Sequence, residues 1–179
     1  MRILVTAGAG FIGSNLVRFL LNQPNVSVAN LDKLTYAGNL ESLQDVQHQS
    51  NYQFFRADII NRQQLTTIFE QFQPDSVMYL AAESHVARSI ENAGSFIQTN
   101  REGTFQLLEA CLNYWKNLNP SAQQAFRFHH ISTAEVFGDL AGTAAKCHEE
   151  TDMPQVLPIQ RQKQPPIIWL VAGTERFNY

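Results

Sequence analysis

A glycine-studded turn near the start of the chain constrains the fold more than any other feature. The apolar run at 2–6 leads directly into Gly8, Gly10 and Gly13, which have the spacing G-x-G-x-x-G. In such a turn the first glycine tightens the bend, the second lets the backbone approach a pyrophosphate, and the third lets helix and strand pack closely. The pattern predicts a dinucleotide-binding turn, although a glycine-rich turn without a ligand would share these residues.

The residues after the turn fit this prediction. Apolar side chains recur there at helical spacing, so we expect a helix over 11–21 with an apolar stripe made of Phe11, Ile12, Leu16, Val17, Phe19 and Leu20. The free N–H groups and the positive dipole end of that helix would face the phosphates.

A second apolar segment, at 26–31, ends at Asp32. This residue follows the glycines by roughly 20 residues, the separation expected for the acid that hydrogen-bonds an adenosine ribose. Because its carboxylate would repel a 2′-phosphate, we expect NAD rather than NADP as the cofactor. Lys33 lies beside the acid, so the expected preference is mild.

The composition argues against several other classes of protein. With 179 residues, 44% hydrophobic and 16% charged, the chain is typical of one globular domain, and its net charge of −3 argues against a nucleic-acid partner. No segment approaches the ~20 apolar residues that span a bilayer, and no signal-peptide pattern is found, so we expect no membrane partner. Cys111 and Cys147 lie far apart and the histidines form no cluster, which indicates a reduced, cytoplasmic protein without a metal site.

Strand and helix patterns alternate along the first three quarters of the chain. Apolar segments predict strands at 3–6, 26–31, 52–57, 76–80 and 126–132. Amphipathic segments predict helices at 11–21, 62–71 and 96–118, with a short helix at 40–46. This alternation is typical of an α/β fold with a doubly wound parallel sheet of the Rossmann type, which binds ligands beyond the carboxyl ends of its strands.

The motifs at those strand ends resemble the dTDP-glucose 4,6-dehydratases, a family of extended short-chain dehydrogenases/reductases. The most specific are D-K-L-T-Y-A-G-N-L at 32–40 and H-H-I-S-T at 129–133. Shorter matches lie at 6–13, 57–59, 80–86, 88–90 and 99–100. The resemblance covers residues 1–151, which we expect to form an NAD-binding Rossmann domain.

The resemblance implies a reaction and a set of site residues. In the family, bound NAD takes hydride from sugar C4, water is eliminated across C5–C6, and hydride returns at C6; the substrate is dTDP-glucose and the enzyme a homodimer. By the resemblance, Ser84 and Thr133 would hydrogen-bond the hexose, with Thr133 also counted as catalytic, and Glu135 would abstract the C5 proton. The NAD-binding residues would be Gly8, Gly10, Phe11, Ile12, Gly13, Asp32, Lys33, Leu34, Thr35, Asp58, Ile59, Leu80, Ala81, Ala82, Glu83, Ser84 and Thr99.

Several of these residues have a plain structural alternative. Asp58 could cap the helix expected near Asn61, because aspartate is a common N-cap. The Ser84 hydroxyl could bond to its own backbone, as serines in loops do. Glu135 could be an ordinary solvated carboxylate.

The chain departs from the family pattern at three positions within the cofactor-binding and catalytic motifs. Ala7 replaces the first glycine of T-G-x-x-G-x-x-G, at a cost on the order of 1 kcal/mol if a positive φ is needed there. Ala87 stands where the family has aspartate. Ala134 replaces the aspartate that protonates the departing C6 hydroxyl, and general acid catalysis is worth ~10²–10⁴-fold, so elimination should be slow.

The regular pattern stops after about Thr151. No tyrosine in the chain is followed by lysine four places later, although the family's Y-x-x-x-K tyrosine removes the 4-hydroxyl proton. When the last base of each codon from Asp152 onward is joined to the first two bases of the following codon, the genetic code permits the sequence Y-A-P-S-S-P-Y-S-A-S-K-A. This sequence is the family's active-site helix. We hypothesise a frameshift near Thr151, so that residues 152–179 are an irregular out-of-frame tail and the substrate domain is missing; the coding DNA tests this.

Three functional interpretations fit the sequence. The chain is a copy of the family's enzyme that is inactive for lack of Y-x-x-x-K and of the acid at 134, a non-catalytic NAD-binding remnant, or a pseudogene product that never folds stably. A dehydratase or epimerase for another nucleotide sugar also fits the motifs. The family's dimer uses the helix that we expect to be lost, so dimerisation of this chain is doubtful.

Overall fold

The computed structural model describes residues 1–84 and 93–133. The predictions for Ala87, Ala134, Glu135 and the tail at 152–179 lie outside these residues. The described strands are β1 (Arg2–Thr6), β2 (Ser27–Asp32), β3 (Tyr52–Arg56), β4 (Ser76–Tyr79) and β5 (Arg127–His130). The described helices are α1 (Phe11–Leu21), η1 (Leu40–Leu43), α2 (Arg62–Phe72), α4 (Ala93–Ile97), η2 (Gln98–Gly103), α5 (Thr104–Lys116) and α6 (Pro120–Ala125).

The five strands form one parallel sheet in the order β3-β2-β1-β4-β5. The chain moves outward from β1 to β2 and β3, then crosses back so that β4 pairs with the other side of β1. The strand order therefore reverses between β1 and β4, and such a switch point opens a crevice beyond the carboxyl ends of the strands. The predicted doubly wound Rossmann-type sheet is confirmed.

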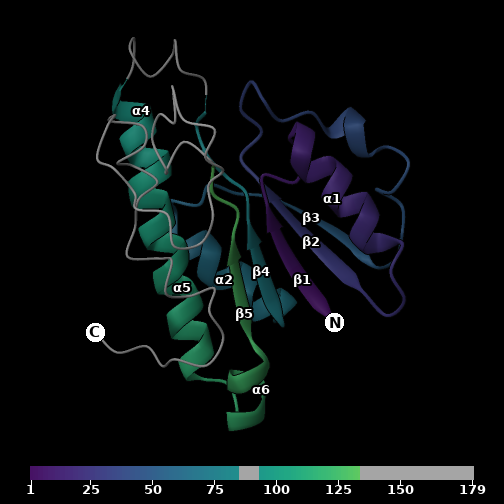
Figure 1. Ribbon diagram of the computed structural model, residues 1–179, viewed down its shortest axis with the longest axis vertical. Helices are drawn as coiled ribbons and strands as arrows, with labels where there is room; N and C mark the ends of the chain where they lie inside the picture. Colours follow the sequence, from purple (N-terminus) through teal and green to yellow (C-terminus); the bar gives the residue numbers. More distant parts are fainter. Residues whose placement is uncertain (85–92, 134–179) are drawn as a thin grey trace, which may run out of the picture.

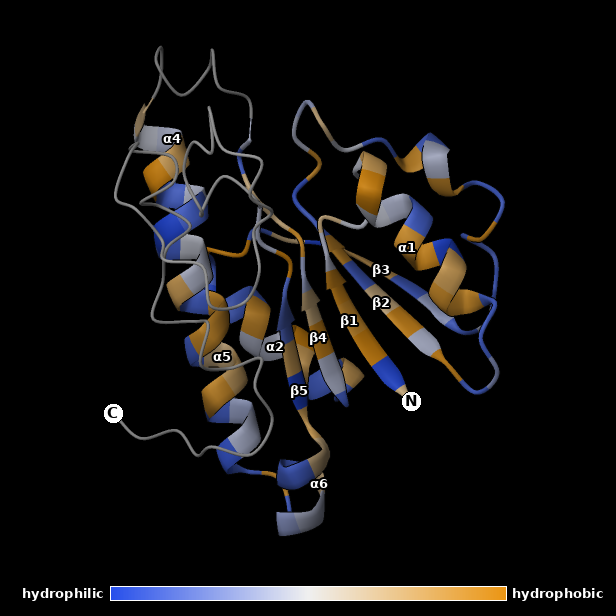
Figure 2. Ribbon diagram, viewed as in Figure 1, coloured by the Kyte–Doolittle hydropathy of each residue, from blue (hydrophilic) through white to orange (hydrophobic). Residues whose placement is uncertain are grey.

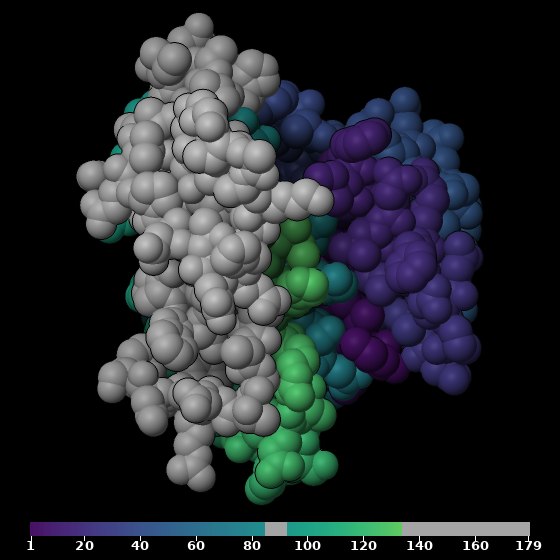
Figure 3. Space-filling model, viewed as in Figure 1, coloured from purple at the N-terminus to yellow at the C-terminus, as the bar shows by residue number. Residues whose placement is uncertain are grey.

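Helices cover both faces of the sheet (Figure 1), with α1 on one face and α2 and α5 on the other. Successive residues of β1 point to opposite faces, as in any strand. Ile3 and Val5 pack with Val17 of α1, whereas Leu4 packs with Leu65 of α2 and with α5. Apolar residues accordingly run along the central strands (Figure 2), and the N-terminal residues, in purple and blue, gather on one side of the molecule (Figure 3).

The helix predicted over 96–118 differs most from the structure. It is divided into α4, the π-helical η2 and α5, and it ends at Lys116. A further short helix, α6, begins at Pro120 with Asn119 as its N-cap and was not predicted. The short helix predicted at 40–46 is the 3₁₀ helix η1. Helical periodicity cannot reveal the π-helical segment, because a wider turn changes the spacing only locally.

The apolar stripe predicted for α1 is only partly buried. Val17 and Leu20 are buried, but Phe11, Ile12 and Phe19 are 88%, 67% and 61% exposed, so only part of the stripe faces the core. Phe11 and Ile12 form the first turn of α1, at the rim where β1 has already ended. Phe19 is rotated by about 200° from Val17 around the helix, so it points away from the sheet.

No helix among the described residues is long and apolar enough to cross a membrane. Within the same residues no group of three or more His, Cys, Asp or Glu side chains could hold a metal ion.

Candidate functional site

Glycine is required at two positions of the turn after β1 because there is no room for a side chain. A Cβ atom on Gly13 would lie 2.1 Å from the carbonyl oxygen of Ala7 and 2.7 Å from the Cα of Gly8. A Cβ atom on Gly8 would lie 2.2 Å from Oδ1 of Asn30, a buried side chain of β2. These contacts fold the turn tightly onto the end of the sheet, as the spacing predicts.

Gly10 differs from its two neighbours because its Cβ position is nearly open. The nearest atom to a Cβ there would be the Ala7 carbonyl oxygen, at 3.3 Å, and the backbone is extended at φ −79°. Space above Gly10 is what a pyrophosphate would need to approach the backbone.

The N-terminus of α1 adds hydrogen-bond donors beside this space. Its N-cap is Gly10, which has no side chain to bond the first N–H groups, and the Ser14 N–H donates to the Gly10 carbonyl. The N–H groups before Ser14 are the ones that a helix leaves unsatisfied, and they suit an anion. The turn therefore fits the phosphates of a dinucleotide.

Ala7 has a positive φ of 55°, as the family's glycine at this position suggested. In the left-handed region an L-residue with a Cβ is strained by about 1–2 kcal/mol. The Ala7 N–H donates to the Leu31 carbonyl at 2.8 Å, and its carbonyl accepts from the Gly10 N–H, so the turn holds the residue in this conformation.

Asp32 ties the glycine turn to the loop after β2. One carboxylate oxygen accepts from the Ala9 N–H at 2.9 Å, and the other accepts from the Leu34 N–H at 2.8 Å. The side chain is buried, yet each oxygen keeps a second lone pair for a ribose hydroxyl. The Asn39 N–H also donates to the Ala9 carbonyl at 2.9 Å. Residues 7–13 and 32–39 thus form one connected unit, which we call the β1–β2 rim.

Lys33 and Thr35 are exposed on this rim, whereas Leu34 is half-buried with a positive φ of 58°. The Lys33 ammonium lies 2.5 Å from Oδ2 of Asp58, which follows β3. Strain of the kind that Leu34 shows, in a bulky residue, is typical of functional sites.

Asp58 does not cap α2, so that alternative is wrong. Asn61 is the N-cap, with its side-chain oxygen accepting from the Gln64 N–H at 3.1 Å. Asp58 instead accepts from the Ile60 N–H at 3.2 Å through Oδ1, which leaves Oδ2 for Lys33. Ile59, which follows Asp58, is buried against Gly103. A Cβ atom on Gly103 would lie 2.6 Å from Cδ1 of Ile59.

Two side chains hold the loop after β4. The Thr6 hydroxyl accepts from the N–H groups of Leu80 and Ala81, both at 3.0 Å. The amide of Asn100 then bonds Glu83 at both ends of its backbone: it accepts from the N–H at 2.8 Å and donates to the carbonyl at 2.9 Å. We call residues 80–84 together with 131–133 the β4–β5 rim.

Asn100 was missed as a site residue by the sequence predictions. It is buried in the π-helical segment η2, next to half-buried Thr99. The Thr104 hydroxyl donates to the Asn100 carbonyl at 2.6 Å. The Tyr79 hydroxyl lies 2.7 Å from the same Thr104 oxygen, and it donates to that oxygen because the Thr104 proton is already used. The T-N dipeptide at 99–100 was the only signal in the sequence, because the contact to Glu83 depends on the fold.

The predicted substrate residues follow neighbouring strands. Ser84 is exposed after β4 and Thr133 is half-buried after β5, and the Ile131 N–H donates to the Tyr79 carbonyl at 2.9 Å. The Tyr36 hydroxyl donates to the Glu83 carboxylate at 3.1 Å, which connects the two rims. The structure therefore brings the described predicted residues to the carboxyl end of one sheet.

Burial dominates the resolved pKa shifts near these rims. Burial raises the pKa of Tyr79 to about 12, although its bond to Thr104 acts in the opposite direction. Burial also raises the pKa of Tyr52, with a smaller increase from the Asp32 carboxylate, and the Asn30 hydrogen bond lowers it. The pKa of the buried Cys111 thiol is raised for the same reason, which makes this cysteine unreactive.

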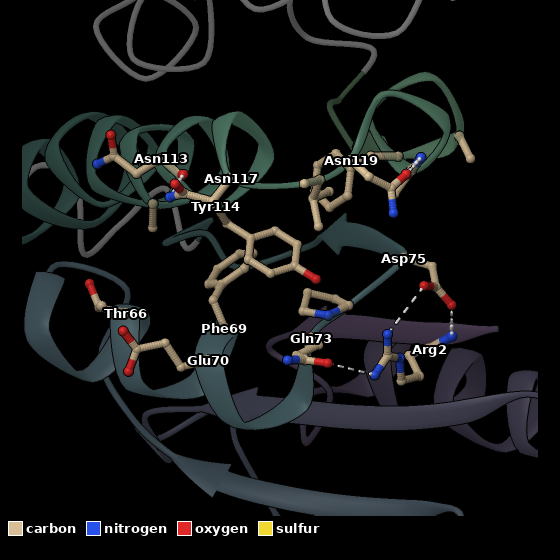
Figure 4. A pocket seen from close by; sticks show the side chains of 16 residues that line it. Arg2, Thr66, Phe69, Glu70, Gln73, Asp75, Asn113, Tyr114, Asn117 and Asn119 are labelled. Atoms are coloured by element: carbon tan, nitrogen blue, oxygen red, sulfur yellow. Dashed lines mark hydrogen bonds and ion pairs between the residues drawn. The ribbon is translucent and has the colours of Figure 1, made fainter.

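One cavity of about 730 Å³ lies elsewhere, at the amino ends of the strands. Figure 4 shows Tyr114 beside Phe69, and Arg2 bonded to Asp75 and Gln73. None of the predicted NAD or substrate residues lines this cavity. Its position at the end of the sheet opposite the glycine turn separates it from the candidate site.

Comparisons with known proteins agree with the geometry. The chain is 53% identical over 161 residues to the dTDP-glucose 4,6-dehydratase of Neisseria gonorrhoeae, covering 90% of this chain and 46% of that protein. It is 58% identical over 142 residues to the enzyme of the same name from Neisseria meningitidis serogroup B, covering 79% and 40%. The crystal structure of dTDP-glucose 4,6-dehydratase from Bacillus anthracis, in complex with NAD, matches with a TM-score of 0.76 and 34% identity, covering 91% of this chain and 47% of that chain.

The chain thus spans less than half the length of these relatives. The family described as GDP-mannose 4,6 dehydratase matches residues 4–158, most of the chain. The Rossmann-type sheet, the glycine turn and these matches together show that the chain belongs to the GDP-mannose 4,6 dehydratase family.

Proposed function

We propose that this chain binds NAD in the crevice between the two rims, as the coenzyme half of a dTDP-glucose 4,6-dehydratase. The observation that carries the proposal is the bond from the Ala9 N–H to the Asp32 carboxylate. It joins a turn with room for a pyrophosphate to the acid expected to bind a ribose, at the switch point of the sheet.

We propose the following position for each part of NAD, from the residues that the family resemblance implies. The backbone at Gly8, Gly10, Phe11, Ile12 and Gly13 would face the pyrophosphate. The adenosine ribose would meet the loop formed by Asp32, Lys33, Leu34 and Thr35, and the adenine would lie near Asp58 and the backbone of Ile59. The nicotinamide half would lie between Thr99 and the loop formed by Leu80, Ala81, Ala82, Glu83 and Ser84.

In the proposed reaction NAD supplies the acceptor for the hydride from C4 of the hexose. Ser84 and Thr133 would hydrogen-bond the sugar, and Glu135 would remove the C5 proton. Ala134 has no proton to give to the departing C6 hydroxyl. We therefore propose that the chain binds NAD but produces little or no 4-keto product.

We also propose that the reading frame shifts near Thr151, so that residues 152–179 are out-of-frame translation. We also propose a cytoplasmic location, because the described Cys111 is buried and free rather than disulfide-bonded. If the codons for residues 152–179 do not spell the active-site helix in the alternative frame, the frameshift is excluded.

Thermal unfolding of the full chain with and without NAD tests the binding proposal. A ligand that binds only the folded state, at 100 times its Kd, stabilises it by ~2.7 kcal/mol, which raises the midpoint by on the order of 5–10 °C. No increase at any NAD concentration would favour the alternative of a pseudogene product that does not fold stably.

A turnover assay with dTDP-glucose and NAD tests the second half of the proposal. We expect no measurable 4-keto-6-deoxy product. Measurable 4-keto product would show that the chain is an active enzyme and would contradict the proposal.

A further inference from the structure

An ion pair beside the proposed adenosine site takes no part in the proposed reaction. Lys33 directly follows Asp32, and its ammonium lies 2.5 Å from Oδ2 of Asp58. The lysine side chain is 53% exposed and the aspartate side chain 22% exposed. Asp58 is fixed by the Ile60 N–H, so the aspartate is the anchored partner and the lysine is the mobile one.

The other charged side chains near the ribose position are those of Asp32 and Arg56. Both oxygens of Asp32 face backbone N–H groups, and the carboxylate is buried. Arg56 is the register partner of Asp32 in the sheet; it is exposed and has no ion pair with the described residues. Of the two cations, Lys33 is the one that follows Asp32 directly and whose charge is neutralised by an ion pair.

We propose that Asp58 determines the preference for NAD over NADP by holding Lys33 in this pair. The proposal rests on the proposed NAD site. A 2′-phosphate on the ribose would meet Asp32 and Asp58 and find the Lys33 charge neutralised, whereas a 2′-hydroxyl adds no charge. Without the Asp58 charge, Lys33 can swing to the 2′-phosphate and form a charge-assisted hydrogen bond.

The Asp58→Asn substitution isolates this effect. Asparagine keeps a side-chain oxygen that can accept from the Ile60 N–H, and it removes only the charge that holds Lys33. The Lys33 end of the pair is exposed to solvent, and ion pairs at the surface contribute little to stability, so the variant should fold. NAD and NADP share the same adenine, so any lost contact to the base cancels in the ratio of their dissociation constants.

The experiment measures the Kd of NAD and of NADP by isothermal titration for four forms of the full chain: the wild type, Asp58→Asn, Lys33→Gln and the double variant. We expect Asp58→Asn to lower the ratio Kd(NADP)/Kd(NAD) by about tenfold, the size of one solvent-exposed charge-assisted hydrogen bond. The double variant should return to within about threefold of the wild-type ratio, because the freed cation is gone. Raising the salt to 1 M should shrink the Asp58→Asn effect, since screening acts within about 3 Å there.

Three outcomes contradict the proposal. An unchanged ratio in Asp58→Asn, with NAD still bound, overturns it while leaving the NAD site intact. A lowered ratio that persists in the double variant assigns the effect to another cation, and Arg56→Gln then identifies it. If the wild type binds neither dinucleotide, the proposed function fails, and this inference fails with it. Circular dichroism of each variant distinguishes a local effect from unfolding.

Discussion

The two rims of the crevice are built by different means. In the β1–β2 rim the backbone is fixed by residues of the rim itself: Gly8 and Gly13 have atoms within 2.2 Å of where a Cβ would stand, and the Asp32 carboxylate accepts from the Ala9 and Leu34 N–H groups. In the β4–β5 rim the backbone is fixed by side chains from distant elements, with Thr6 and Asn100 bonding residues 80–83. The first rim therefore tolerates few substitutions at its own glycines, and the second depends on residues outside it.

The largest effect is expected for Gly13→Ala in the β1–β2 rim. The new methyl group would overlap the Ala7 carbonyl and the Gly8 Cα, which are backbone atoms that cannot move independently. We expect a loss of about 3 kcal/mol in the free energy of unfolding, measured by urea denaturation. Gly10→Ala is the matched control, since its Cβ meets only one atom at 3.3 Å. Equal stability of the two variants would contradict the steric account of this rim.

The β4–β5 rim should be the more sensitive of the two to alkaline pH. The pKa of Tyr79 is raised from its ordinary value of 10.0 to about 12 in the folded chain, so the folded state keeps its proton over this range. Stability from the neutral phenol is complete below pH 10 and declines as the pH rises toward 12, by up to about 2 kcal/mol. Chemical denaturation at pH 9 to 12 should show this decline, and Tyr79→Phe should reduce its slope. An identical slope in both proteins would remove Tyr79 as the cause.

Replacing Asn100, whose side-chain amide bonds the backbone of Glu83, should weaken the β4–β5 rim without disturbing the glycine turn. Asn100→Leu keeps a similar volume but leaves the N–H and carbonyl of Glu83 without their buried partner. We expect about 2 kcal/mol of destabilisation and weaker NAD binding. Asn113→Leu on helix α5 is the control, because Asn113 is exposed and lines the cavity at the opposite end of the sheet. If both variants bind NAD as the wild type does, Asn100 has no positioning role.

The smallest expected effect is a gain in stability from a substitution in the β1–β2 rim. Ala7→Gly relieves the positive φ of 55° and should raise the free energy of unfolding by about 1 kcal/mol. Differential scanning calorimetry of the two proteins measures this gain. A less stable Ala7→Gly variant would mean that the flexibility of glycine in the unfolded chain outweighs the relieved strain.

The same contrast explains how far the sequence alone could predict the molecule. Glycine spacing and alternating apolar segments are local, so they correctly predicted the five strands, the turn and the position of Asp32. The interpretation of Ala7 as a strained replacement for glycine was confirmed by its φ.

What the sequence could not predict depends on contacts between distant residues. The Asn100 side chain bonds the backbone of Glu83 and so joins η2 to the loop after β4. The π-helical segment that carries Asn100 has no sequence signature strong enough to detect. The exposed fractions of Phe11 and Ile12 also depend on the fold, because a helical stripe does not reveal where the sheet beneath it ends.

The central claim is that the open space above Gly10 receives a pyrophosphate. Isothermal titration of NAD into the wild type and into Gly10→Val tests it most directly, because valine is compatible with the extended backbone at this position and fills the space. We predict one bound NAD per wild-type chain and no detectable binding to Gly10→Val, with thermal midpoints within a few degrees of each other. Equal binding by both proteins, or none by a folded wild type, would contradict the claim.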